Sequence, residues 1–168
     1  MDKNIVLIGM MGSGKTTVGG LLARRLNRPF IDTDVLIEER EGRSISEIFA
    51  RGGEDAFRAV ELELSRELSG QGGLIIACGG GLPTRDEAIR ALKEHGLVFW
   101  LDRDPGETYD GLDVSHRPLA RSGREDFIRR YQDRAPIYQK WSDHIIRAGS
   151  PQEAEALITA ICSEVFGL

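Results

Sequence analysis

The stretch Gly9-Met10-Met11-Gly12-Ser13-Gly14-Lys15-Thr16 decides the fold of this chain. It fits G-x-x-x-x-G-K-[ST], the phosphate-binding P-loop, in which backbone N–H groups surround the phosphates of a nucleotide. The apolar run Asn4-Ile5-Val6-Leu7-Ile8 precedes the loop and indicates a buried strand, and apolar residues at helical spacing follow it. Because strand, glycine loop and helix come in this order, the sequence predicts a nucleoside triphosphate site rather than a solvated turn.

The P-loop pattern also predicts what single residues do. Lys15 reaches the outer phosphates, and the hydroxyl of Thr16 ligates the Mg²⁺ that accompanies the nucleotide. The N-terminus of the following helix adds partial positive charge at the same place. The residues expected to bind the phosphates are Gly12, Ser13, Gly14, Lys15, Thr16 and Thr17.

Length and composition indicate an ordinary globular domain. A chain of 168 residues is expected to form one domain, residues 1–168. Its net charge of −5 argues against nucleic acid as a main partner, and no apolar run approaches the roughly 18 residues of a membrane span. Cys78 and Cys162 are too few and too far apart for a zinc site or a disulfide framework. We therefore expect a cytoplasmic protein.

Strand and helix signals alternate along the rest of the chain. Further strands are expected at residues 29–31, 74–78, 97–101 and 144–146. Capping boxes predict helix starts at Ser44 with Glu47, Thr84 with Glu87, Asp104 with Glu107, and Ser150 with Glu153. This alternation predicts an α/β fold in three layers, a five-stranded parallel sheet with helices on both faces. Ligands of such sheets bind beyond the carboxyl ends of the strands.

Two acidic residues, Asp32 and Asp34, follow the second predicted strand. Residues i and i+2 of an extended chain project to the same side, so both carboxylates are expected to face the crevice. One of two neighbouring carboxylates stays protonated unless a cation lies close, and a magnesium nucleotide supplies that cation. Asp is also common at helix N-caps, and the sequence leaves both interpretations open for each residue.

Three other features attract attention. Arg58 and Glu61 lie three residues apart on a predicted helix, and taken alone this spacing favours a surface ion pair. Gly79-Gly80-Gly81 follows a buried strand, where missing side chains let a ligand approach the backbone. In the arginine-rich segment 117–134, a solvated helical face does not explain Arg117 beside Pro118, nor Arg134.

This ordered set of motifs resembles the shikimate kinase family and spans almost the whole chain. The residues that carry the resemblance are 9–19, Asp32-Thr33-Asp34, Phe57-Arg58-x-x-Glu61, Gly79-Gly80-Gly81, Arg117-Pro118-Leu119 and Arg134-Ala135-Pro136-Ile137-Tyr138. The resemblance implies an enzyme that transfers the γ-phosphoryl group of ATP to the 3-hydroxyl of shikimate, in chorismate and aromatic amino-acid biosynthesis. It implies ATP and shikimate as partners, and we expect a monomer.

The resemblance also implies roles for individual residues. Lys15, Asp34 and Arg117 would be catalytic, with Asp34 holding ring hydroxyls and taking the proton. Arg117 would come from a mobile lid, about residues 111–123, and the acceptor-binding region would be about residues 33–61. Asp32 would hold Mg²⁺ through water. The residues that would bind shikimate are Asp34, Arg58, Gly79, Gly80, Gly81 and Arg134.

Two positions complicate this assignment. Members of the family usually carry an arginine about seven residues before the Arg-Pro-Leu motif, and this arginine packs on adenine. In this chain the corresponding position falls at or near Asp110. Arg147 or the turn Gly149-Ser150-Pro151 is a candidate to cover the base in its place. Asp102 ends a strand that resembles a Walker B strand and is an alternative metal ligand, although Asp32 is favoured.

Two other kinds of protein remain as alternatives. Another P-loop small-molecule kinase, of the gluconate or nucleoside monophosphate type, would share the fold but would not need Arg58, Arg134 and the three glycines together. A non-catalytic ATP-binding regulator would not need the acidic residues Asp32 and Asp34.

Overall fold

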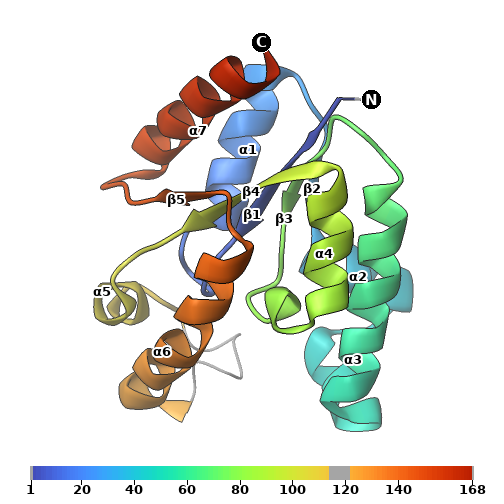
Figure 1. The fold of residues 1–168 in the computed structure, drawn as a ribbon. Coiled ribbons are helices and arrows are strands. Elements are labelled where there is room, and N and C mark those ends of the chain that lie inside the picture. Colours follow the sequence, from blue (N-terminus) through green and yellow to red (C-terminus); the bar gives the residue numbers. More distant parts are fainter. Residues whose placement is uncertain (1, 114–121, 168) are drawn as a thin grey trace.

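The computed structural model describes residues 2–113 and 122–167 of the chain. These residues form a five-stranded parallel sheet in the order β2-β3-β1-β4-β5 (Figure 1). The strands are β1 (Asn4–Ile8), β2 (Phe30–Asp32), β3 (Ile75–Ala77), β4 (Gly96–Leu101) and β5 (His144–Ile146). The α/β fold predicted from the sequence is confirmed.

Helices cover both faces of this sheet (Figure 1). Helices α1 (Lys15–Leu26) and α7 (Pro151–Phe166) pack on one face. The other face carries α2 (Thr33–Glu41), α3 (Ile45–Ser69), α4 (Asp86–Glu94) and α6 (Arg124–Trp141). The short helices η1 (Leu82–Thr84) and α5 (Pro105–Asp110) follow β3 and β4. Among the described residues, no helix is both long and apolar enough to cross a membrane.

The central strand β1 explains why its sequence is apolar throughout. Ile5 and Leu7 belong to the core cluster under α1 and α7, whereas Val6 and Ile8 belong to the cluster on the opposite face. All four side chains are fully buried. A parallel strand that is covered on both faces has no solvent side, so polar residues do not alternate with the apolar ones.

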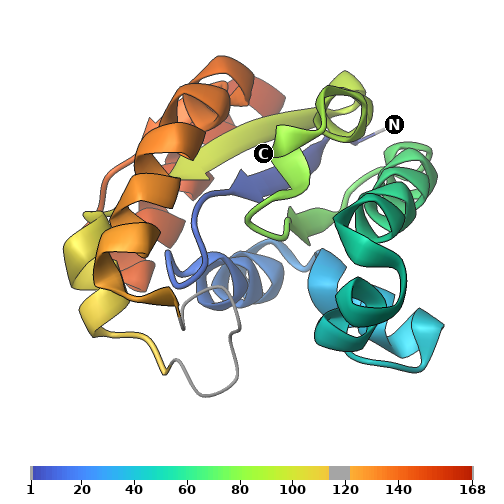
Figure 2. The ribbon, with the colours of Figure 1, turned by 90° about the horizontal axis from the view of Figure 1, so that it is seen from below.

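The strand order places the site. From β1 the chain crosses to β2 and β3 on one side of the sheet, then returns past β1 to β4 and β5. Ligands of open α/β sheets bind at the carboxyl ends of the strands where the order reverses in this way. The P-loop follows β1, and residues Gly79–Gly81, here called the glycine turn, follow β3. Figure 2 looks onto this end of the molecule, with α6 on one side of the P-loop and α2 and α3 on the other.

Three of the four predicted helix caps are confirmed. The side chains of Ser44, Asp104 and Ser150 accept hydrogen bonds from backbone N–H groups three residues further on. The cap predicted at Thr84 is wrong, because one turn of 3₁₀ helix lies between the glycine turn and α4. The hydroxyl of Thr84 donates instead to the carbonyl of Gly81, at 2.5 Å.

Candidate active site

The P-loop joins β1 to α1 and bends at its glycines. Gly12 (φ 77°) and Gly14 (φ 97°) lie in the left-handed region, which residues with a side chain adopt only with strain. Gly14 is directly followed by Lys15, the first residue of α1. The loop therefore directs backbone N–H groups and the positive end of α1 toward one point, as an anion site requires.

Lys15 places its ammonium group inside the loop. Its Nζ donates to the carbonyls of Gly9 and Met10, both at 2.8 Å, and the residue is buried. A buried cation at the N-terminus of a helix lies where phosphate oxygens of a nucleotide would bind. The position of Lys15 therefore agrees with the role predicted for it.

Asp32 connects the P-loop to α2. Its Oδ2 accepts a hydrogen bond of 2.7 Å from the hydroxyl of Thr16. Its Oδ1 accepts from the backbone N–H groups of Asp34 and Val35, at 3.1 and 3.2 Å. Asp32 is thus the N-cap of α2, so the capping interpretation is confirmed for this residue. The carboxylate also lies beside the hydroxyl expected to ligate Mg²⁺.

Asp34 lies in the first turn of α2, because the helix already begins at Thr33. The expectation that residues 32–34 form an extended chain is therefore wrong, although the two carboxylates lie close enough for the charge of Asp32 to act on Asp34. Asp34 lies instead against Gly79, where an added Cβ would come within 2.4 Å of its Oδ1. Burial, and after it the charge of Asp32, raises the pKa of Asp34 to about 6, although Lys15 and Arg58 oppose the shift. Such a carboxyl can exchange a proton near neutral pH.

Arg58 and Glu61 form a buried ion pair, so the surface ion pair expected from their spacing is wrong. Nη1 of Arg58 lies 2.5 Å from Oε1 of Glu61, and Glu61 is only 1% exposed. This face of α3 turns toward the glycine turn, where an added Cβ on Gly81 would come within 2.1 Å of Nη2 of Arg58. Burial raises the pKa of Glu61 to about 7, although Arg58 opposes the shift.

Arg134 reaches the glycine turn from α6. Its Nη1 lies 3.4 Å from the position of an added Cβ on Gly80. The same position lies 3.4 Å from the backbone nitrogen of Met11 and 3.5 Å from the carbonyl oxygen of Gly9. The structure therefore brings Asp34, Arg58 and Arg134 from three separate helices to one turn that directly adjoins the P-loop.

The lid motif lies outside the described residues. Arg117, Pro118 and Leu119 fall within residues 114–121, so their predicted roles stay predictions. Helix α5 ends at Asp110, before this segment, and α6 begins at Arg124, after it. Asp110, at the end of α5, pairs with Arg124 at the start of α6 through an exposed ion pair of 3.0 Å.

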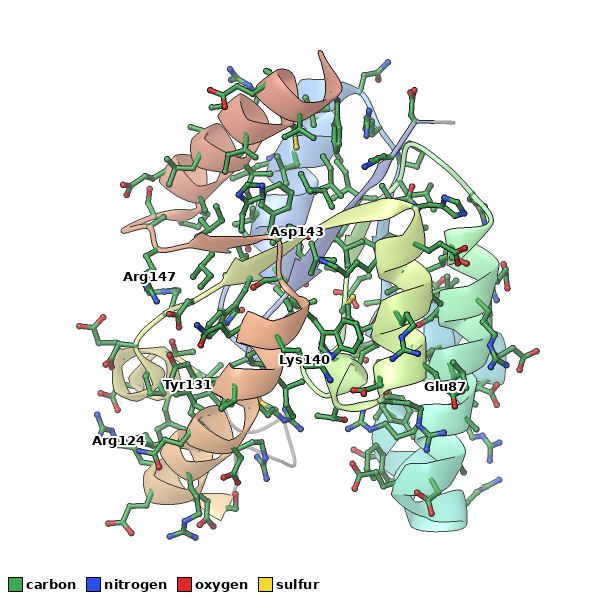
Figure 3. All side chains as sticks on the ribbon, in the orientation of Figure 1. Glu87, Arg124, Tyr131, Lys140, Asp143 and Arg147 are labelled. Carbon is green, nitrogen blue, oxygen red and sulfur yellow. The ribbon has the colours of Figure 1, made fainter. Side chains whose placement is uncertain are left out.

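Asp102 is held by two partners that the sequence did not predict. Its Oδ1 accepts a 2.7 Å hydrogen bond from the hydroxyl of Tyr131 on α6, and its Oδ2 lies 3.0 Å from Nε of Arg147 after β5. Figure 3 labels Tyr131 on α6 and Arg147 just after β5. Both oxygens of Asp102 and both oxygens of Asp32 contact protein groups, but only Asp32 accepts from the hydroxyl of Thr16 in the P-loop, whereas Asp102 contacts Tyr131 and Arg147. This difference favours Asp32 as the residue nearest to a bound cation.

A pocket of about 70 Å³ lies behind the P-loop, on the side away from the glycine turn. Its walls come from the P-loop, α1, the end of β4, Arg103, the end of β5, the turn after β5, and α7. The lining residues are Ser13, Gly14, Val18, Leu101, Arg103, Ile146, Ala148, Gly149, Ser150, Pro151 and Ala154. The turn Gly149-Ser150-Pro151, a candidate from the sequence to cover the base, is part of these walls, and its role toward the base stays a prediction. Arg103 was missed because nothing in the sequence brings it next to this turn.

Comparisons with known proteins agree with this geometry. A sequence model of the family described as shikimate kinase matches residues 11–165. A shikimate kinase of Clostridium botulinum (strain Eklund 17B) is 42% identical over 150 residues, which cover 89% of this chain and 90% of the relative. A structure of shikimate kinase from Acinetobacter baumannii in complex with shikimate is 32% identical, with a TM-score of 0.88 over 99% of this chain and 94% of the other.

A gluconokinase from Sinorhizobium meliloti shares only the fold, at 15% identity, a TM-score of 0.60, and coverage of 98% of this chain and 96% of the other. The two shikimate kinases are much more similar in sequence, and the family match, residues 11–165, spans the motifs from Gly12 of the P-loop to Tyr138. The chain therefore belongs to the shikimate kinase family.

Proposed function

We propose that this ATP-dependent kinase transfers the γ-phosphoryl group of ATP to the 3-hydroxyl of shikimate between the P-loop and the glycine turn, giving shikimate 3-phosphate and ADP. The observation that carries the proposal is the convergence of Asp34, Arg58 and Arg134 on a turn that adjoins the P-loop. A phosphoryl donor and a small acceptor bound at these two places would lie next to each other, as the transfer requires.

The chemistry of the acceptor fits the side chains at the glycine turn. Shikimate is a small carboxylate with neighbouring hydroxyl groups, so its site needs guanidinium groups for the acid and a carboxylate for the hydroxyls. Arg58 and Arg134 supply the first and Asp34 the second. Glu61 and Glu54 hold the guanidinium of Arg58 in place, at 2.5 and 3.2 Å. The backbone of Gly79, Gly80 and Gly81 completes this acceptor site.

Phosphoryl transfer then depends on charge and orientation. Lys15 neutralises charge on the outer phosphates, and the N–H groups of residues 12–17 bind the remaining oxygens. Asp34 accepts the proton of the attacking hydroxyl. By the family resemblance, Arg117 closes over the phosphates from a lid of about residues 111–123 and excludes water.

All of these residues come from one copy of the chain, so we propose that the protein is a monomer. We also propose that residues 1–168 form one domain and that the acceptor-binding region covers about residues 33–61.

The residues around Thr16 fit Mg²⁺. Its hydroxyl and the carboxylate of Asp32 are hard oxygen donors, 2.7 Å apart, next to the phosphate site. No cluster of three or more His, Cys, Asp or Glu residues exists in the described part of the chain. This agrees with Mg²⁺, which keeps several waters and binds through one or two protein groups and the substrate phosphates. When bound, the ion would neutralise phosphate charge; Thr16 would ligate it directly and Asp32 through water.

A coupled assay of ADP release, with and without shikimate, tests this function. We expect ADP release to depend on shikimate and to stay near background with gluconate or a nucleoside monophosphate as acceptor. Turnover with gluconate in place of shikimate would point to the other small-molecule kinases. ATP binding without turnover on any acceptor would point to a regulator.

Replacing Arg58 or Arg134 with Ala is expected to weaken shikimate binding much more than nucleotide binding. Each change removes hydrogen bonds to a charged group, worth roughly 1.5–3 kcal/mol, or about ten- to 100-fold in affinity. Calorimetry with shikimate and with a non-hydrolysable ATP analogue measures both effects. Arg129→Ala is a matched control on α6, because Arg129 forms an exposed ion pair with Asp126. If both ligands weaken equally, the acceptor role of the two arginines is wrong.

A further inference from the structure

The glycine turn is held by buried hydroxyl groups from two distant elements. The N–H of Gly79 donates to Oγ1 of Thr33 at 2.9 Å, and Thr33 is 1% exposed. The hydroxyl of Tyr138 donates to the carbonyl of Gly80 at 2.6 Å, and Tyr138 is fully buried. A buried backbone group without a partner is costly, and β3 ends before the turn, so these hydroxyls replace the partners that a strand would supply.

The two hydroxyls come from the elements that carry the acceptor-binding side chains. Thr33 immediately precedes Asp34 at the start of α2. Tyr138 lies four residues after Arg134, on the same side of α6. The hydroxyl of Tyr138 also lies 3.6 Å from the sulfur of Met10 in the P-loop. Each hydroxyl therefore joins the glycine turn to a helix that carries a residue proposed to bind the acceptor, Asp34 on α2 and Arg134 on α6.

Gly79 and Gly81 are needed for space rather than for backbone conformation. None of Gly79, Gly80 and Gly81 has the positive φ that favours glycine. Added Cβ atoms on Gly79 and Gly81 would instead come within 2.4 Å of Asp34 and 2.1 Å of Arg58. These two side chains lie directly on the turn, so any displacement of the turn displaces them too.

We infer that Thr33 and Tyr138 are positioning residues for the acceptor: their buried hydroxyls fix the glycine turn, and the turn fixes Asp34 and Arg58. This inference rests on the proposed function, because it concerns the same acceptor site. It assigns neither residue a contact with the reacting atoms. Removing either hydroxyl loosens the geometry of the acceptor site and leaves the Lys15 side of the P-loop in place.

Thr33→Val and Tyr138→Phe test the inference, since each keeps the shape of the side chain and removes its hydroxyl. We expect the KM and Kd for shikimate to rise roughly tenfold, because small displacements of positioning groups cost up to about 10²-fold. The Kd for a non-hydrolysable ATP analogue is expected to stay within about twofold of wild type. Thr33→Ser, which retains the oxygen, is expected to restore shikimate binding.

Two controls remove a hydroxyl elsewhere. Tyr131 lies on the same helix as Tyr138, and Tyr131→Phe removes the hydroxyl that contacts Asp102. Thr159→Val removes the hydroxyl that contacts Glu155 on α7. Both are expected to bind shikimate as wild type does. Shikimate binding that is unchanged in Tyr138→Phe, or lost equally with nucleotide binding, overturns the inference, even if Thr33→Val does not fold. Failure of the wild-type protein to bind shikimate would instead overturn the proposed function.

Discussion

Replacing Lys15 with Met is expected to abolish turnover, lowering kcat by roughly 10³-fold or more. The ammonium group is buried at the N-terminus of α1, where the P-loop N–H groups converge. Charge on the transferring phosphoryl group is most spread in the transition state, so a fixed cation counts most there. Met keeps the length and apolar character of the stem. The coupled ADP-release assay at saturating ATP and shikimate measures the loss.

The controls for this variant must separate charge from loop structure. Nζ of Lys15 holds the carbonyls of Gly9 and Met10, so the thermal unfolding of Lys15→Met has to be compared with that of wild type. Lys140→Met is the matched control, because Lys140 is exposed on α6 and pairs with Asp86. Its turnover is expected to equal that of wild type. A folded Lys15→Met protein with wild-type kcat would refute the P-loop assignment.

Local patterns were sufficient to predict the sheet, because a buried parallel strand leaves a continuous apolar run. The run at residues 4–8 became β1, and the weak signal at residues 144–146 became β5. The caps at Ser44, Asp104 and Ser150 were also predictable from local sequence, because a cap depends on residues only three apart. The cap predicted at Thr84 is wrong because Thr84 lies in the 3₁₀ turn before α4, where its hydroxyl donates to the carbonyl of Gly81.

Contacts between distant parts of the chain determine those features of the site that local sequence patterns did not predict. Spacing alone makes Arg58 and Glu61 a surface pair, yet α3 packs this face against the glycine turn and buries it. The sequence left open whether Asp32 caps a helix or belongs to an extended segment 32–34, and the structure shows that it caps α2, which begins one residue later. The partners of Asp102 are Tyr131 and Arg147, separated from it by 29 and 45 residues, and no local pattern joins them.

The three glycines show how a sequence pattern can predict close approach to the backbone without identifying which groups approach. Their grouping after a buried strand predicted that something approaches the backbone closely. In the structure, the groups that approach it are the side chains of Asp34 and Arg58. Only a contact between α2, α3 and the turn reveals this, and such contacts depend on the whole fold. The roles of the glycines, of Arg134 and of Arg117 toward substrates stay predictions.

Replacing Asp34 with Asn is expected to lower kcat by roughly 10²–10⁴-fold while nucleotide affinity changes little. An amide has the shape of the carboxyl group but cannot accept the proton of the attacking hydroxyl. The side chain lies against Gly79, where an isosteric replacement fits in the same space. Steady-state kinetics with saturating substrates gives kcat, and calorimetry with an ATP analogue gives the nucleotide Kd. Wild-type kcat in Asp34→Asn would exclude a general-base role.

The parallel change Asp32→Asn separates the two carboxylates. Asn is as good an N-cap as Asp, so α2 is expected to stay folded. Losing the negative charge beside Thr16 is expected to raise the Mg²⁺ concentration needed for half-maximal activity, with kcat at saturating Mg²⁺ reduced less than in Asp34→Asn. Asp102→Asn is the control, because Asp102 contacts Tyr131 and Arg147 and Asp32 contacts the hydroxyl of Thr16. If Asp102→Asn raises the Mg²⁺ requirement and Asp32→Asn does not, the metal role belongs to Asp102.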